Sequence, residues 1–209
     1  HSNGSEHAMY APSNESIAYT TLASVSRRLN YIDLATGTAK TILSKEDVDT
    51  FAWGPRSGSL AYDLTSGCQI NVIGYNGTGK KTIVNIPKPA RANCISSTNA
   101  SASVNIPYGT HASKNVWSPD GKWILYTRRS KDGVQNLYKV NWATLEKKKL
   151  TSNRDKTVQI SHTTWLANDT IAYLQNNPSG LDDRIVKVNS DGTGRVTVLK
   201  RAAITKFDW

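Results

Sequence analysis

The chain is built from short stretches in which apolar and polar residues alternate. In the stretch 16–21, for example, Ile17 and Tyr19 alternate with small or polar residues. Alternation over four to eight residues between turn residues is typical of a half-buried β-strand. No stretch shows the 3.6-residue period of an amphipathic helix with comparable strength. The pattern therefore predicts an all-β chain.

One aromatic residue recurs at the end of the first predicted strand of each of several similar segments. These aromatic anchors are Tyr10, Trp53, Trp117, Trp165 and Trp209, and they lie 43, 64, 48 and 44 residues apart. The first four are each followed by a turn and by a second strand that reaches another tyrosine, at Tyr19, Tyr62, Tyr126 and Tyr173. Self-similarity at such a period indicates a repeat architecture.

Each repeat predicts a meander of four antiparallel strands. The strands expected in the first two repeats are 7–10, 16–21, 29–34 and 39–43, and then 50–53, 59–63, 69–73 and 81–84. Those expected in the last two are 114–117, 123–127, 137–140 and 147–150, and then 162–165, 170–174, 184–188 and 195–199. The repeats would span about 7–45, 49–86, 113–152 and 160–200, with an insertion at 85–115 and the start of a further repeat at 204–209.

A four-stranded meander cannot bury both of its faces alone, so the sheets must stack. Stacking of such sheets around an axis is the β-propeller, in which each sheet is a blade. We expect the aromatic anchors to wedge between adjacent blades, because aromatic side chains bury enough area to stabilise that interface. The prediction is one propeller domain, 1–209, of about four blades and the first strand of a fifth. A small closed ring, a fragment of a larger ring and an arc completed by another chain all remain open, and we favour the fragment.

Composition narrows the class of protein and of partner. The 209 residues carry 26 Lys and Arg against 16 Asp and Glu, a net charge of +10, which attracts anionic partners. No run approaches the roughly 18 apolar residues of a membrane span, so we expect no transmembrane segment. The two cysteines, Cys68 and Cys94, leave a single disulfide open.

The sequence carries no strong catalytic or metal-binding motif. The segment GYNGTGKKT at 74–82 resembles a phosphate-binding loop, but Lys81 replaces the required hydroxyl and a strand follows where a helix is needed, so we interpret it as a hairpin turn. There is no Gly-x-Ser-x-Gly nucleophile elbow, and the four histidines do not cluster at ligand spacing. We expect no catalytic residues, no metal and no cofactor.

Basic residues fall in two kinds of place. Those on predicted fourth strands and their turns are best explained as charges that discourage edge-to-edge pairing. Others lie in the connections between second and third strands: Arg27, Arg28, Arg128, Arg129, Lys131 and Arg184. These connections would project from one side of the blades, where loops on a rigid scaffold usually carry binding. We therefore predict a basic binding surface there.

The third repeat resembles a known propeller family. Its sequence Trp117-Ser-Pro-Asp-Gly-Lys-Trp-Ile-Leu-Tyr126, followed by KDGVQNLY at 131–138, looks like the repeat of TolB-like propellers, also called PD40 or WD40-like repeats. The other repeats are degenerate, with Ala-Pro-Ser-Asn at 11–14 and Gly-Pro-Arg-Ser at 54–57. The resemblance implies a family of periplasmic binding proteins, cell-surface scaffolds and propellers attached to serine peptidases, commonly with six or more blades.

Together these features predict a non-catalytic binding or scaffold propeller outside the cytoplasm, whether extracellular, cell-surface or periplasmic. The expected partner is a protein, acidic in character, or an acidic glycan, and no nucleic-acid module is recognisable. One alternative is an accessory propeller of a serine peptidase or other hydrolase, with its catalytic domain outside these residues. Another is a carbohydrate-binding propeller that uses exposed aromatics such as Tyr108.

Overall fold

The computed structural model of the chain describes residues 5–24, 26–56, 58–64, 69–85, 101–103, 116–130, 132–167, 169–177, 182–201 and 204. Within these ranges every regular element is a β-strand and none is a helix, which confirms the all-β prediction. The strands form four separate antiparallel sheets of four strands each. The expected architecture of four-stranded blades is therefore confirmed.

Blades 1 and 2 follow the chain in simple meanders. Blade 1 contains β1 (Ser5–Tyr10), β2 (Ser16–Ala23), β3 (Ser26–Asp33) and β4 (Ala39–Leu43). Blade 2 contains β5 (Val48–Trp53), β6 (Ser59–Leu64), β7 (Gln69–Gly74) and β8 (Lys81–Asn85). In both sheets each strand pairs with the next strand in the sequence, so the hydrogen-bonded contacts are local along the chain.

Blades 3 and 4 repeat this order. Blade 3 contains β9 (Ser101–Ser103), β10 (Trp123–Arg129), β11 (Gln135–Asn141) and β12 (Lys147–Lys149). Blade 4 contains β13 (Gln159–Trp165), β14 (Thr170–Asn176), β15 (Asp183–Asn189) and β16 (Val196–Arg201).

The first strand of blade 3 differs from the predicted one. It was expected at 114–117, but Trp117 makes only an isolated bridge to Ile124, and the strand that pairs with β10 is β9, from within the expected insertion. β9 lies opposite Thr127–Arg129, at the far end of β10 from that bridge. The bridge at Trp117 leaves the backbone groups of this end of β10 without partners on that side. β9 supplies those partners, as buried backbone polar groups require.

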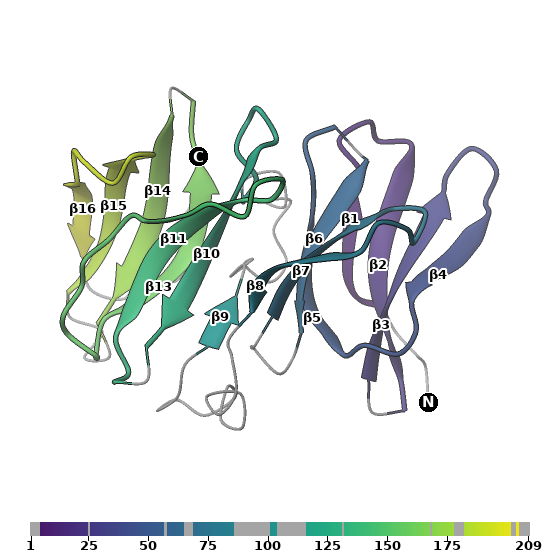
Figure 1. Cartoon of the computed structure of the whole chain (residues 1–209), viewed down its shortest axis with the longest axis horizontal. Helices are drawn as coiled ribbons and strands as arrows, with labels where there is room; N and C mark the ends of the chain where they lie inside the picture. The colour runs from purple at the N-terminus through teal and green to yellow at the C-terminus, as the bar shows by residue number, and fades with distance from the viewer. Residues whose placement is uncertain are drawn as a thin grey trace.

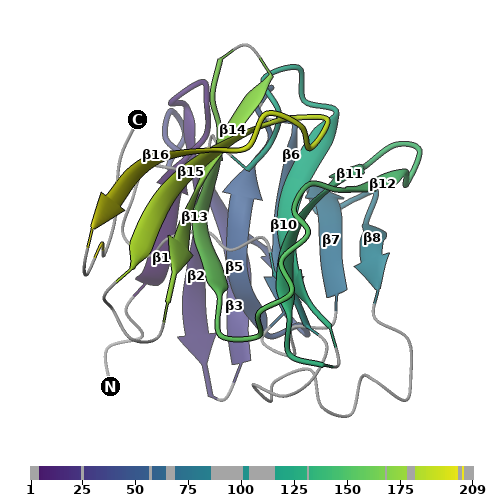
Figure 2. The same ribbon diagram turned by 90° about the vertical axis from the view of Figure 1, so that its left-hand side faces the viewer.

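The four blades stand side by side in chain order and form an open arc. Figure 1 shows blade 4 at one end of the row and blade 1 at the other, and Figure 2 looks along the row with blade 4 in front. Contacts between sheets join successive blades, as between β3 and β5 or between β11 and β13. Much of the core lies between these stacked sheets.

Stacking also explains why the second strands differ in burial. In β6, Leu60, Ala61 and Tyr62 are all fully buried, because blade 2 has a neighbour on both faces. In β2 of blade 1, the equivalent Ile17 and Tyr19 are only half-buried, while Ala18 between them is buried. The apolar residues Ile17 and Tyr19 of β2 thus lie on the less covered face of blade 1, and the buried face carries small and polar residues.

A recurring hydrogen bond links each blade to the one before it. The indole Nε1 of Trp53 donates to the Met9 carbonyl oxygen at 3.1 Å, and the indole of Trp117 donates to that of Ala52 at 3.4 Å. The indole of Trp165 donates to the Val116 carbonyl oxygen at 3.1 Å. Each acceptor directly precedes the aromatic anchor of the preceding blade. All three indoles are at most 5% exposed, whereas Tyr10 of blade 1, over which no described blade packs, is 50% exposed.

Candidate functional site

The junctions between successive blades share a set of equivalent positions, which we call a slot. A slot is bounded by the turn after the first strand of the earlier blade, by the anchor indole of the later blade, and by the residue that follows the third strand of the later blade. Between blades 1 and 2 the slot holds a cavity of about 240 Å³ beside Trp53 and Tyr75. Between blades 2 and 3 it holds a cavity of about 520 Å³ beside Trp117 and Trp142.

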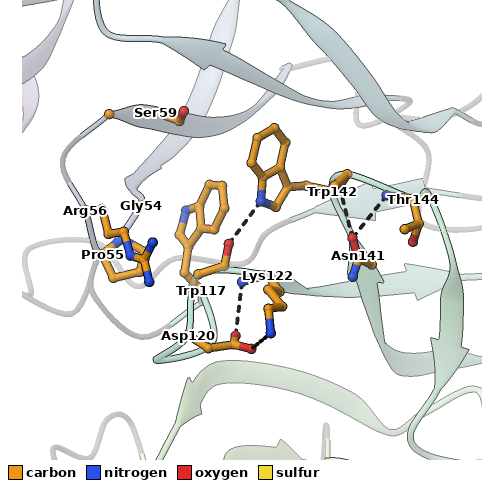
Figure 3. A pocket seen from close by; sticks show the side chains of 13 residues that line it. Gly54, Pro55, Arg56, Ser59, Trp117, Asp120, Lys122, Asn141, Trp142 and Thr144 are labelled. Atoms are coloured by element: carbon orange, nitrogen blue, oxygen red, sulfur yellow. Dashed lines mark hydrogen bonds and ion pairs between the residues drawn. The ribbon is translucent and has the colours of Figure 1, made fainter.

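Two tryptophans form one wall of the larger slot. The rings of Trp117 and Trp142 meet edge to face, with centroids 6.3 Å apart and planes at 69°. The Trp142 indole donates to the Gly121 carbonyl oxygen at 3.0 Å, and the Trp117 indole donates to Ala52. Because both indole N–H groups already donate to backbone carbonyl oxygens, the two tryptophans present only ring carbons to the cavity. In Figure 3 the two indoles lie side by side in the middle of the pocket.

The Ser-Pro-Asp-Gly turn shapes the same slot. Ser118 Oγ donates to Asp120 Oδ1 at 2.6 Å, and the Lys122 backbone N–H donates to the same oxygen at 3.0 Å. Burial opposes ionisation of Asp120, but these hydrogen bonds and the nearby Lys122 charge outweigh it, so the pKa of Asp120 is lowered. Gly121 has φ of +73°, and a Cβ there would lie 3.3 Å from the Pro55 ring of blade 2. The turn is therefore both locally locked and fitted against its neighbour.

Charged side chains stand at the mouth of the larger slot. Lys122 Nζ lies 3.3 Å from Asp120 Oδ2, so these two charges largely offset each other. Arg56 lines the same cavity, is exposed, and makes no ion pair with any residue that the structure describes. Figure 3 shows Arg56 beside Pro55 on one side of the cavity. The mouth of the slot is therefore slightly cationic.

The predicted basic surface is only partly free. Its described members lie at the end of the sheets that carries the connections between second and third strands. We call this end the hairpin edge, and it is at the bottom of Figure 1. The Arg27 backbone N–H donates to Asp47 at 2.9 Å and its guanidinium lies 3.4 Å from Asp49, so Arg27 is tied to the start of blade 2. Arg184 pairs with Asp182, and that contact raises the pKa of Arg184.

Two arginines of the hairpin edge remain available. Arg28 lies opposite Thr21 and Arg128 opposite Asn136, both near the tips of their hairpins, and both are exposed. Among the described residues, neither forms an ion pair. Arg129 is half-buried and donates to the Gly133 carbonyl oxygen at 2.9 Å, which rigidifies the hairpin of blade 3. The structure thus separates exposed from structural arginines.

Several predicted residues lie outside the described part of the chain. These are Lys131, Cys68, Cys94, Tyr108 and Trp209. Within the described ranges, no group of three His, Cys, Asp or Glu residues is placed to hold a metal ion. No described helix has the length and apolar character to cross a bilayer.

The sequence analysis missed the larger slot. Its residues Ser59 and Trp142 belong to no recognised motif, and they line one cavity with Gly54 and Trp117 only because blades 2 and 3 stack. One signal was present in the repeat: Trp142 and Tyr75 both directly follow a third strand, so aligning the ends of those strands would have paired them. A cavity between the two blades was not visible from that alignment.

Comparison with solved structures extends this description. An oligogalacturonate lyase in complex with manganese matches 93% of this chain with a TM-score of 0.70 and 14% identity, over 52% of its own length. TolB from Acinetobacter baumannii matches 95% of the chain with a TM-score of 0.63 and 17% identity, over 44% of its length. The chain has a TolB-like propeller fold. A dipeptidyl peptidase 4 from Porphyromonas gingivalis matches 95% of it with a TM-score of 0.65 and 11% identity, over 33% of its length.

The TolB-like chain thus spans about half, or less, of each of these three structures. At such low identities the similarity establishes the fold and not an activity. No protein-family model matches the sequence, and no curated protein sequence matches it either.

Proposed function

We propose that this TolB-like chain is a non-catalytic binding module that presents its hairpin edge to an acidic macromolecule outside the cytoplasm. The observation that carries the proposal is the pair of exposed arginines, Arg28 and Arg128, on blades 1 and 3. Their neighbours Arg27 and Arg184 are held by aspartates, whereas these two are available to a partner. The net charge of +10 favours the same class of partner.

The blades support this role because they hold the hairpins in fixed relative positions. The indole hydrogen bonds at each junction tie every blade to the preceding one. A rigid scaffold loses little conformational freedom when a partner binds, which favours binding at loops and hairpin tips. An acidic protein is the preferred partner, and an acidic glycan is a chemical alternative with the same charge.

A charge-matched pair of variants tests the proposal. In the Arg28→Gln/Arg128→Gln variant two charges are removed from the hairpin edge, and in Lys147→Gln/Lys149→Gln two are removed from the exposed strand β12. Binding to polyglutamate and to heparin is measured at two salt concentrations. We expect the arginine variant to weaken binding about three- to tenfold, since exposed charge pairs contribute about 0.2–1 kcal/mol each.

The control variant should leave binding within about twofold of the unaltered chain. Equal losses in both variants would mean that binding follows net charge alone, and the hairpin edge would then not be a site. Preference for heparin over polyglutamate would assign the site to glycans. Cell fractionation that finds the native polypeptide only in the cytosol would contradict the proposed location.

We also propose that further blades complete the ring around this arc. The outer face of blade 1 carries Tyr10, Ile17 and Tyr19, which are exposed or half-buried, whereas their equivalents in blades 2 and 3 are buried between sheets. The solved structures that the chain resembles are also considerably longer than it is. The mass of the native polypeptide tests this: a mass equal to that of the 209 residues would require a second chain instead.

An accessory propeller of a peptidase is the second candidate function. It is favoured by one observation, the fold similarity to a dipeptidyl peptidase 4, of which this chain spans 33%. The same measurement of the native polypeptide discriminates the two functions. Additional blades alone would favour the binding module, whereas a catalytic domain in the same polypeptide would favour the accessory role.

A further inference from the structure

A tyrosine of the chain itself lines the slot between blades 1 and 2. The Tyr31 ring lies 6.5 Å from the Trp53 ring at 64° and 5.3 Å from the Tyr75 ring at 40°. Its hydroxyl forms a hydrogen bond of 2.9 Å with Ser16 Oγ. Lys40 Nζ sits 5.2 Å from the Tyr31 ring centroid. Tyr31 thus has two aromatic neighbours and one hydroxyl partner in this slot.

Strand register identifies the equivalent positions in the next slot. Tyr31 lies opposite Ala18, and Val72 lies opposite Ala61 at the same point of blade 2. Likewise Ser16 begins β2 opposite the last residue of β3, and Ser59 begins β6 opposite the last residue of β7. The larger slot therefore has a valine where the smaller slot has its tyrosine.

The three partners of that tyrosine are nevertheless present in the larger slot. Trp117 stands at the position of Trp53, and Trp142 at that of Tyr75, and Ser59 at that of Ser16. The Ser59 hydroxyl forms no hydrogen bond with any residue in the described ranges, whereas Ser16 is bonded to Tyr31. The larger slot therefore repeats the two aromatic partners and the serine, with its two aromatic rings in direct contact.

The larger slot has room for an additional ring. The cavity of about 520 Å³ is more than twice that of the first slot, and it lies within the range of small-molecule sites, about 300–1,000 Å³. Val72 is buried in the core and does not line the cavity. Gly54 stands at the position of Ala11, and because glycine has no Cβ the larger slot has one side-chain carbon fewer there.

The junction between blades 3 and 4 is occupied in a third way. Lys139, opposite Leu125, stands at the position of Tyr31, and Trp123 stands at the position of the serine. Lys139 Nζ lies 4.3 Å from the Trp123 ring centroid and 5.8 Å from that of Trp165. Both side chains pack against the later blade. Of these three junctions, as far as the structure describes them, the one between blades 2 and 3 carries small residues at both positions.

We propose that the slot between blades 2 and 3 binds a p-hydroxyphenyl group from outside the chain, such as the side chain of a tyrosine. The ring lies against the carbon faces of Trp117 and Trp142, and its hydroxyl bonds to Ser59. Aromatic pairs in this arrangement are favourable beyond their buried area. Arg56 at the mouth favours a carboxylate next to the ring. The slot lies away from the hairpin edge, so this inference does not depend on the proposed function.

Binding of capped single amino acids tests the proposal. The full chain is titrated with N-acetyltyrosinamide, N-acetylphenylalaninamide and N-acetylleucinamide, and binding is followed by ligand-observed NMR. We expect saturable binding of the tyrosine probe and about fivefold weaker binding of the phenylalanine probe, because one hydrogen bond contributes about that factor. The leucine probe should bind weakest. No saturation by the tyrosine probe, or equal binding of all three, would overturn the proposal.

Variants locate the binding in the slot. Val72→Tyr places a tyrosine at the strand position of Tyr31, and it should abolish binding while thermal unfolding stays cooperative. Should that variant fail to fold, Ser59→Ala decides: it should weaken the tyrosine probe about fivefold and leave the phenylalanine probe unchanged. The matched control Tyr75→Ala alters the other slot and should leave binding unchanged. Loss of binding in the control, or none in Ser59→Ala, would refute the assignment.

Two further probes ask two separate questions: whether the ring comes from a polypeptide or a small molecule, and whether the slot binds a sugar instead. 4-Hydroxyphenylacetate carries the ring without a peptide backbone; tighter binding of the capped tyrosine assigns the slot to polypeptides, and tighter binding of the acid assigns it to small molecules. Either order supports the hydroxyphenyl site. Methyl β-galactoside tests whether the tryptophan wall instead receives a sugar. Saturable binding of the galactoside in preference to the tyrosine probe would overturn the proposal.

Discussion

The aromatic anchors provide a sharp test of what holds the blades together. Trp53 and Tyr10 occupy the same position of the repeat, but Trp53 is 1% exposed between blades 1 and 2 and Tyr10 is 50% exposed on the outer face of blade 1. If the anchors act between blades, truncation should be costly at Trp53 and tolerated at Tyr10. Truncating Trp53 and truncating Tyr10 therefore tests the same repeat position with and without a blade packed over it.

The structure sets the expected magnitudes. Trp53→Ala removes a fully buried indole and leaves the Met9 carbonyl oxygen without its donor, so we expect a loss of about 3–5 kcal/mol in the free energy of unfolding. Trp53→Phe keeps most of the ring and removes the donor, which should cost about 1–3 kcal/mol. Tyr10→Ala should cost about 1 kcal/mol or less, because half of its surface is already hydrated.

Urea unfolding followed by circular dichroism measures these differences. A shift of the midpoint at unchanged slope reports a change in stability. The expected order of destabilisation is Trp53→Ala, then Trp53→Phe, then Tyr10→Ala. Equal losses for Tyr10→Ala and Trp53→Ala would show that the anchor stabilises its own blade and not the junction. The explanation of the fold by wedged indoles would then be wrong.

Three other perturbations follow from buried or constrained residues. Asp63→Ala removes the acceptor of the Thr50 backbone N–H at 2.9 Å and of its hydroxyl at 2.6 Å, and should lower the free energy of unfolding by about 2–3 kcal/mol, whereas Thr50→Ser should cost less than about 1 kcal/mol. Burial raises the pKa of Tyr173 to about 12 from 10.0, although the charge of Arg195 opposes this. The unfolded chain therefore loses this proton first, and stability that is present below pH 10 falls as the pH rises towards 12; urea midpoints across this window should fall less in Tyr173→Phe, and an equal fall would contradict the assignment. Gly192→Ala places a Cβ at φ of +90° and 3.4 Å from the Leu150 backbone, so thermal unfolding should show a loss of at least about 1 kcal/mol, and an unchanged midpoint would show that this turn relaxes freely.

Most strands were predictable because their pairing partners are neighbours along the chain. Alternation at Ile17 and Tyr19 predicts β2, and the run Leu60, Ala61 and Tyr62 predicts β6, since hairpin pairing joins residues a short distance apart. The sequence does not say how many faces of a strand are covered. Ile17 and Leu60 occupy the same repeat position, yet only Leu60 has a sheet packed over it.

The first strand of blade 3 and the roles of the arginines could not be predicted. β9 comes from a segment without periodicity, and it is recognised only by its pairing with Thr127–Arg129. Arg27 and Arg28 are adjacent and chemically identical in the sequence. Only the folded chain brings Asp47 and Asp49 to Arg27 and leaves Arg28 exposed. The contacts of Arg27 cross from blade 1 to blade 2, so the local sequence pattern carries no information about them.

The amino-acid sequence alone determined most of the β-strands, the four repeats and the aromatic anchor of each repeat, because antiparallel meanders are specified by alternation and by turn residues within about 40 residues of chain. The tertiary structure decided what each repeat position does. Tyr31, Val72 and Lys139 share one position, but the tyrosine lines its slot, the valine is buried away from the cavity, and the lysine covers a tryptophan. The physical reason is that the contents of a slot depend on side chains from two stacked sheets, and their combined volume exists only after the sheets have packed.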